Sequence, residues 1–267
     1  MTRRALPGIA AALFWLAVWQ VVSMLVGQVL LVPAPLVVLA TLFDLVRTPT
    51  FWAVTGWSLL RMGTGFVVGV VVGCAAAVLT TRFRTADALL SPALRVVRAA
   101  PVASFIIVAL VWIPTGRLPA FIAFLMVVPV VWDNMAAGLL RQDPALLEMA
   151  SVFRLGWWPT LVRIRIPSLL PFFTTACTTG MGLAWKSGVA AEVISRPELS
   201  IGGQLQDAKV YLATPEVFAW TITAVALSMA LEKVLRLATS RVNLRVAGGG
   251  TEASRNQERG SVADAGV

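Results

Sequence analysis

The chain has 267 residues, of which 58% are hydrophobic and 13% are charged, and its mean hydropathy is +0.83. A water-soluble domain of this length needs more charge to cover its surface, so the composition predicts a protein embedded in a lipid bilayer. Histidine is absent and cysteine occurs only twice, which excludes most enzymes that depend on zinc, histidine acid–base chemistry or a Ser-His-Asp triad; no metal or cofactor is expected.

Residues 9–32 form the first uncharged run. The run is long enough to cross about 30 Å of hydrocarbon at about 1.5 Å per residue, and it is too long for the apolar region of a cleavable signal. We therefore expect a retained first membrane helix that ends at Pro33 and Pro35. Residues 36–46 are shorter and amphipathic, which favours a helix at the membrane surface.

Residues 62–81 form the second uncharged run. Gly65, Gly69 and Gly73 occupy every fourth position there, so they share one helix face and permit close contact with a neighbouring helix. Four further spans are expected at residues 98–117, 117–141, 168–193 and 217–231. The predicted fold class is thus all-α, a polytopic membrane bundle of about six transmembrane helices, followed by a disordered tail at residues 247–267.

The distribution of the basic residues along the sequence agrees with this topology. If the N-terminus is cytoplasmic, 16 of the 22 Lys and Arg residues fall on the inner side of the membrane. The positive-inside rule then favours an even number of spans, with both termini in the cytoplasm. Because the charges are spread over separate loops, the net charge of +9 does not indicate a nucleic-acid partner.

The longest inner loop, residues 141–167, opens with the features of a short amphipathic helix. Asp143 can accept hydrogen bonds from the first free amides, and Pro144 suits the first helical position. Gly156 is expected to supply the left-handed residue that ends the helix. These features alone fit a solvated helical connector equally well.

The same loop resembles the EAA loop of ABC importer permeases, which reads E-A-A, three residues, G, nine residues, I, one residue, L-P. The matching positions are Glu148, Ala150, Ile164 and Pro167. The departures are Met149 for alanine, Arg154 for glycine and Ile166 for leucine. The resemblance implies that this segment forms a coupling helix which docks in a groove of the ATPase subunit, with Gly156 taking over the missing glycine two residues later.

The wider chain, over about residues 32–237, is similar to permeases for nitrate, sulfonate, taurine and related small solutes. The pieces that carry this likeness are residues 89–92, 98–104, 148–171, 182–186 and 191–194. The resemblance implies a type I ABC importer permease domain over residues 1–246, working as a homodimer in a bacterial plasma (inner) membrane. Its implied partners are cytoplasmic ABC ATPase subunits and an extracytoplasmic solute-binding protein.

The sequence contains no G-x-x-x-x-G-K-[ST] phosphate-binding loop, so ATP hydrolysis is expected to be done by a partner and the chain itself is not expected to be an enzyme. The expected function is the inward passage of a small solute, with nitrate-, sulfonate- or taurine-like anions favoured. An ion-coupled secondary transporter or a channel is the alternative, because both also use charges inside the membrane. A coupling helix would have no role in either.

Charged residues inside the predicted spans are candidates for the solute pathway. These are Asp133, Lys186 and Glu192, together with the hydroxyl of Thr178. Lys186 and Glu192 lie about 240° apart around a helix, so they do not form a same-face pair and each needs another partner. The alternatives are structural ion pairs for the charges and a hydrogen bond to the preceding helical turn for Thr178.

Overall fold

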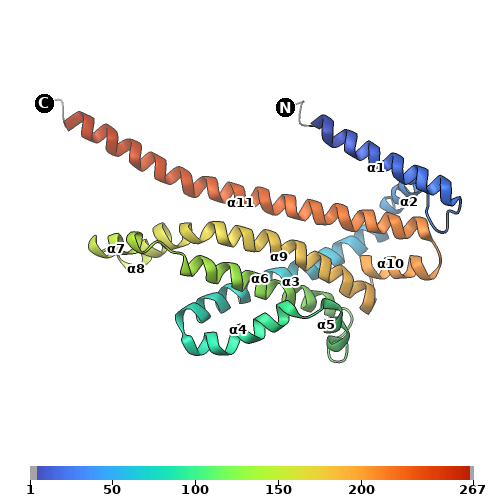
Figure 1. Ribbon diagram of the computed structural model, residues 1–267, viewed down its shortest axis with the longest axis horizontal. Helices are drawn as coiled ribbons and strands as arrows, with labels where there is room; N and C mark the ends of the chain where they lie inside the picture. Colours follow the sequence, from blue (N-terminus) through green and yellow to red (C-terminus); the bar gives the residue numbers. More distant parts are fainter. Residues whose placement is uncertain (1–4, 265–267) are drawn as a thin grey trace. The chain divides into compact units, whose positions relative to one another are not determined.

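The computed structural model describes the backbone of residues 5–264 and the side chains of residues 10–11 and 13–239, and the elements it describes are helices (Figure 1). In chain order they are α1 (Ala5–Val26), α2 (Pro35–Val46), α3 (Pro49–Arg82), α4 (Arg84–Ala99), α5 (Val102–Ala109), α6 (Leu118–Leu140), α7 (Pro144–Val152), α8 (Trp157–Thr160), the π-helical turn η2 (Leu161–Arg165), α9 (Ile166–Ser195), α10 (Ile201–Val210) and α11 (Thr214–Asp264). The predicted all-α fold is confirmed. The predicted disordered tail, residues 247–267, lies outside the residues whose side chains are described.

Several helices are suited to a bilayer. Among the described residues, α3, α6 and the Thr214–Thr239 part of α11 are long and apolar enough to cross a membrane. These correspond to the predicted second, fourth and sixth spans. Helix α9, the predicted fifth span, is long enough at 30 residues but is less apolar than these three.

The first predicted span is shorter than expected, because α1 ends at Val26 and not at Pro33. Gly27 follows with a φ of +64°, a left-handed conformation that glycine adopts without strain, and its N–H donates to the Ser23 carbonyl. The prolines instead begin the next helix, since Pro35 is the first residue of α2. Hydrophobicity alone does not indicate this stop, because the uncharged run continues to Val32.

The third predicted span, residues 98–117, is also wrong as a single straight helix. Helix α4 ends at Ala99, and α5, only eight residues long, leaves at a bend of 104°. Pro101 explains the break, because it has no N–H to donate and its ring pushes the preceding Ala100 into an extended conformation. Together α4 and α5 form a broken span or a re-entrant loop.

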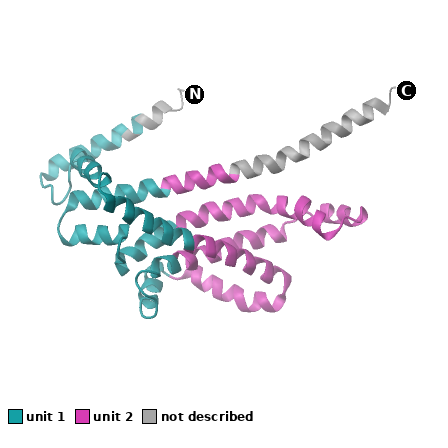
Figure 2. Ribbon diagram, turned by 180° about the vertical axis from the view of Figure 1, so that it is seen from behind, with its two compact units in different colours: residues 1–64, 101–122, 185–228 teal, residues 65–100, 123–184, 229–267 magenta. Residues whose placement is uncertain are grey.

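The chain divides into two compact units (Figure 2). Unit 1 comprises residues 1–64, 101–122 and 185–228, and unit 2 comprises residues 65–100, 123–184 and 229–267. In unit 1, Phe51 stacks on Trp220 with 5.2 Å between ring centroids, and the Trp185 indole N–H donates to the Ala224 carbonyl. These contacts join α3 and α9 to the first turns of α11.

The core of unit 2 lies where α3, α6 and α9 pack together. A Cβ added to Gly69 would lie 2.8 Å from the Cβ of Val127, and one added to Gly73 would lie 2.7 Å from the Cβ of Val131. The predicted close contact along the glycine stripe is therefore confirmed at these two positions. The Trp132 indole N–H also donates to the buried Thr80 hydroxyl at 2.9 Å, which satisfies both polar groups.

Candidate functional site

The predicted coupling segment begins as the sequence indicates. The Asp143 carboxylate accepts a hydrogen bond from the Ala145 N–H at 2.9 Å, and Pro144 occupies the first helical position of α7. Because the proline lacks an N–H and the aspartate satisfies another free donor, the start of this short helix is fixed locally.

The end of α7 differs from the prediction. Arg154, not Gly156, adopts the left-handed conformation, with a φ of +51°. The Arg154 N–H bonds to the Ser151 carbonyl and the Leu155 N–H bonds to the Ala150 carbonyl, the two hydrogen bonds of a Schellman motif. Gly156 has a φ of −60° and precedes α8. The stop therefore stays at the position where the EAA pattern has glycine, because two hydrogen bonds there outweigh the strain in an arginine.

Helix α7 presents apolar side chains to its surroundings. Leu146, Met149 and Phe153 are exposed and lie on one face, with Val152 beside them. Ala150, four residues after Leu146, lies beside it on the helix and is buried, whereas Glu148 is exposed. In the described part of unit 2, this short helix thus combines a fixed start, a fixed end and an uncovered apolar face.

Ile164 and Pro167, which match the EAA pattern, lie where the loop joins the next long helix. Ile164 is in the π-helical turn η2, and Pro167 is in the first turn of α9. Both are half-buried. Pro167 cannot donate to the carbonyl four residues earlier and its ring crowds that carbonyl, which accounts for the wider turn directly before it.

Asp133 forms an ion pair in unit 2. Its carboxylate oxygen Oδ2 lies 2.6 Å from Nη1 of Arg98 in α4. Both side chains remain about half exposed. Sequence reasoning selected Asp133 but missed Arg98, whose contact depends on the break after α4.

Lys186 and Thr178 both lie on α9. Lys186 is exposed, and no ion pair with another described residue holds its ammonium group. The Thr178 hydroxyl donates to the Thr174 carbonyl one turn earlier at 2.8 Å, as the backbone alternative anticipated. The expected absence of a Lys186–Glu192 pair agrees with the partners that Glu192 actually has.

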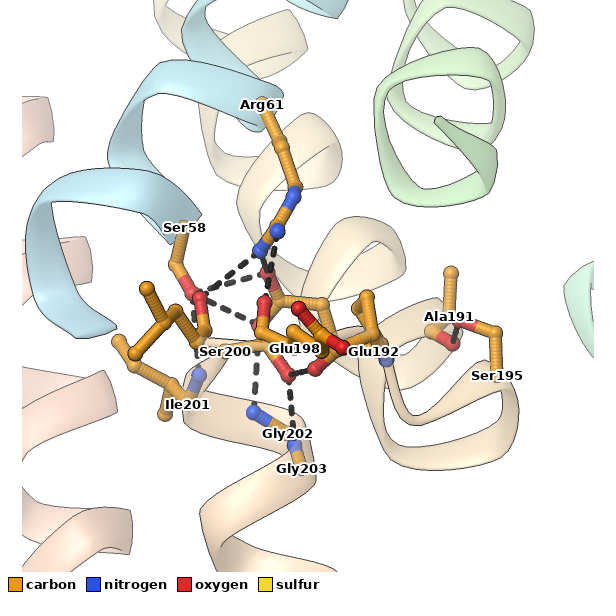
Figure 3. Close-up of polar contacts among 12 residues, drawn as sticks. Ser58, Arg61, Ala191, Glu192, Ser195, Glu198, Ser200, Ile201, Gly202 and Gly203 are labelled. Atoms are coloured by element: carbon orange, nitrogen blue, oxygen red, sulfur yellow. Dashed lines mark hydrogen bonds and ion pairs between the residues drawn. The ribbon is translucent and has the colours of Figure 1, made fainter. Parts of the chain in front are cut away.

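Glu192 is the centre of a buried polar network in unit 1 (Figure 3). Its side chain is 0% exposed, and the Ser58 hydroxyl lies 2.8 and 2.9 Å from its two oxygens. The Gly202 N–H donates to Oε2 at 3.2 Å, and Nη1 of Arg61 lies 3.5 Å from Oε1. A charge this deep is tolerated only when it is paired and hydrogen-bonded, and each condition is met here.

The network joins the turn before α10 to helix α3 (Figure 3). Arg61 donates to the carbonyls of Glu198 and Leu199 at 2.8 and 2.9 Å, while the Ser58 hydroxyl accepts the Ile201 N–H at 3.0 Å. Ser200 caps the helix by accepting the Gly203 N–H. The first amides of α10 are thereby satisfied inside the protein.

Glycine at position 202 makes this arrangement possible. A Cβ there would lie 2.4 Å from the Cβ of Glu192 and 2.4 Å from the Val193 backbone nitrogen. The Ser-Ile-Gly-Gly run at residues 200–203 could have indicated the helix cap, but no local pattern pairs Glu192 with Ser58 or Arg61.

Known proteins are similar to most of this chain. A family model described as "Binding-protein-dependent transport system inner membrane component" matches residues 69–247. The "Putative aliphatic sulfonates transport permease protein SsuC" of Bacillus subtilis is 24% identical over 225 residues, covering 83% of this chain and 81% of the relative. The "Bicarbonate transport system permease protein CmpB" of Synechococcus elongatus is 26% identical over 159 residues, covering 59% of this chain and 57% of the relative.

Two solved structures share the fold. A chain of the "Crystal structure of an amino acid ABC transporter with histidines" superposes with a TM-score of 0.56 at 16% identity, covering 70% of this chain and 90% of that one. The MetNI methionine ABC transporter in an inward-facing conformation gives a TM-score of 0.50 at 16% identity, covering 73% and 93%.

The all-helical fold and the helices that are long and apolar enough to cross a membrane agree with the family match. Members of such importers work with separate ATPase subunits and a binding protein, so the chain is a transport subunit and not an enzyme. The chain belongs to the family of binding-protein-dependent transport system inner membrane components, the permease subunits of ABC importers.

Proposed function

We propose that the chain forms one half of a homodimeric permease that carries a small anion of the sulfonate or bicarbonate class into the cell. Two relatives support the anion, since their names refer to aliphatic sulfonates and to bicarbonate. Both solutes have trigonal or tetrahedral oxygen groups with negative charge. A path built between two copies of the chain suits a subunit that supplies only half of a two-fold permease.

The observation that carries the coupling role is the uncovered apolar face of α7. Leu146, Met149 and Phe153 would be costly to expose to water, so a partner is expected to cover them. In our proposal the partner is the ATPase subunit, and Glu148, Ala150, Ile164 and Pro167 shape the segment that docks. ATP binding then moves α7 together with α9, which follows it in the chain.

The proposed orientation places α7 and both termini in the cytoplasm. Support comes from the concentration of basic residues in the inner loops. A single cysteine at position 154, in a chain whose Cys74 and Cys177 are replaced by alanine, tests it. The cysteine should resist an impermeant thiol reagent in intact cells and react after permeabilisation. Labelling in intact cells would refute the orientation.

The complete importer, reconstituted in nanodiscs with its ATPase and binding protein, tests the transport proposal. An alkanesulfonate, taurine, nitrate or bicarbonate, loaded on the binding protein, should stimulate ATP hydrolysis. Stimulation by methionine, which carries no sulfonate, nitrate or bicarbonate group, with none from these four solutes, would overturn the assignment.

The docking role of α7 has a matched pair of variants. Met149→Asp places a charge on the apolar face, whereas Ser151→Asp places the same charge about 160° away around the helix, on an exposed polar position. Copurification of the ATPase should be lost in the first variant and kept in the second. Equal retention in both would mean that the ATPase does not cover this face.

A further inference from the structure

The ion pair between Arg98 and Asp133 lies along a helix that is long and apolar enough to cross a membrane. Helix α6 has 23 residues, about 35 Å at about 1.5 Å per residue, which is enough to cross about 30 Å of hydrocarbon. Asp133 is seven residues before the last residue of this helix, so it lies about 10 Å along the axis from that end. When the full length of α6 crosses the bilayer, the carboxylate lies within the span and not at its rim.

Both side chains of this ion pair are more than half exposed. The side chain of Arg98 is 60% exposed and that of Asp133 is 51% exposed, although Nη1 and Oδ2 are 2.6 Å apart. Hydrocarbon cannot solvate such groups, and a charge at this depth costs several kcal/mol unless water or protein surrounds it. The face of α4 and α6 that carries the pair must consequently line an aqueous space or meet another protein surface.

The break after α4 brings the arginine to this position. Arg98 is the penultimate residue of α4, and the extended Ala100 and Pro101 end the helix directly beyond it. In the described part of unit 2, Asp133 is the one side chain to which the Arg98 guanidinium donates. Because a guanidinium carries five N–H donors in a planar fork, donors remain for a second oxygen-bearing anion.

We propose that the Arg98 guanidinium binds the anionic solute during its passage, and that Asp133 holds this guanidinium in place and competes with the solute for it. This inference rests on the proposed transport of an anion and names the charge that recognises it. Sulfonate and bicarbonate groups can accept two parallel N–H bonds from one arginine, as a carboxylate does. Asp133 keeps the cation neutralised between transport cycles, so that the solute is released and not trapped.

Three variants of the complete importer test the proposal: Arg98→Gln, Asp133→Asn and the double variant. Arg98→Gln should lower anion uptake about tenfold or more, the effect of losing charge-assisted hydrogen bonds. Asp133→Asn removes the competing carboxylate and should lower the KM for the anion by a similar factor. The double variant has no unpaired charge, so its thermal stability should be close to wild type while uptake remains low.

A purely structural pair would behave differently. Both single variants would then destabilise the permease dimer, and the double variant would recover uptake as well as stability; that recovery would overturn the proposal. An unchanged KM in Asp133→Asn would also overturn the proposal, and this measurement does not depend on whether the double variant folds. Arg236→Gln is the control, because it removes another exposed arginine that pairs within unit 2, with Glu232 at 3.6 Å, and should leave uptake unchanged.

The wild-type importer separates this inference from the proposed function. If no anion stimulates wild-type ATP hydrolysis, the proposed function and this inference fail together. If the wild type transports an anion and the double variant transports it equally well, the proposed function stands and only the role of Arg98 fails.

Discussion

Removal of the Glu192 carboxylate is expected to destabilise unit 1 strongly. Glu192→Ala would leave the Ser58 hydroxyl and the Gly202 N–H without their acceptor and would strip the counter-charge from Arg61, whose side chain is 13% exposed. Removing one partner of a buried ion pair costs about 3–5 kcal/mol, because the other charge stays buried. Glu192→Gln keeps the volume and one acceptor oxygen, so its cost should be about 1–3 kcal/mol.

The measurement is the thermal midpoint of the purified permease dimer. For a chain of this size, about 3 kcal/mol corresponds to a fall of about 6–12 °C. Membrane proteins often unfold irreversibly in detergent, so all variants should be heated at the same rate. Glu198→Gln is the matched control, since it makes the same chemical change on an exposed side chain of the same unit and should shift the midpoint very little.

The ranking of the thermal midpoints decides between a structural role and a solute-binding role for Glu192. A structural network predicts that the midpoint falls from wild type to Glu192→Gln and further to Glu192→Ala. If Glu192→Gln has a wild-type midpoint but altered uptake, the carboxylate acts on the solute and the structural argument is refuted. A midpoint equal to that of Glu198→Gln in both Glu192 variants would show that the buried hydrogen bonds contribute little.

Two further predictions concern the coupling segment and α9. Arg154→Gly should stabilise the permease by about 1 kcal/mol, since glycine adopts the left-handed conformation without strain. Gly156→Val should have almost no effect on the thermal midpoint, because the φ of −60° at this position suits any residue. A clear fall in the midpoint for Gly156→Val would restore Gly156 as the helix stop. Lys186→Met should reduce anion uptake with an unchanged thermal midpoint, because Lys186 is exposed and pairs with no described carboxylate. A destabilised dimer with normal uptake would instead indicate a structural contact.

Local sequence signals predicted the start of α7 and the glycine stripe of α3. Asp143 and Pro144 act on amides within the next turn, so their effect does not depend on the rest of the fold. The four-residue spacing of Gly69 and Gly73 likewise sets a helix face before any partner is known. The partner helix, α6, came only from the structure.

The end of α7 shows how hydrogen bonding can outweigh residue preference. A glycine two residues downstream was expected to move the stop, because arginine pays a steric cost in the left-handed region. The structure keeps the stop at Arg154, where the Ser151 and Ala150 carbonyls both find donors. A stop at Gly156 would need α7 to continue through residues 153–155 and would give up both of these hydrogen bonds.

Local sequence patterns do not predict contacts between residues that lie far apart in the chain. The helical spacing of Lys186 and Glu192 indicates that Glu192 needs another partner, but Ser58 lies 134 positions away in the sequence. Arg98 was missed for a related reason. A single span over residues 98–117 begins at Arg98 and places the guanidinium at the membrane edge. The break at Pro101 ends α4 there and turns α5 away by 104°, and Arg98 at the end of α4 lies beside Asp133, within the length of α6. A proline that disrupts a hydrophobic run thus decides which residue of a neighbouring helix a charge meets.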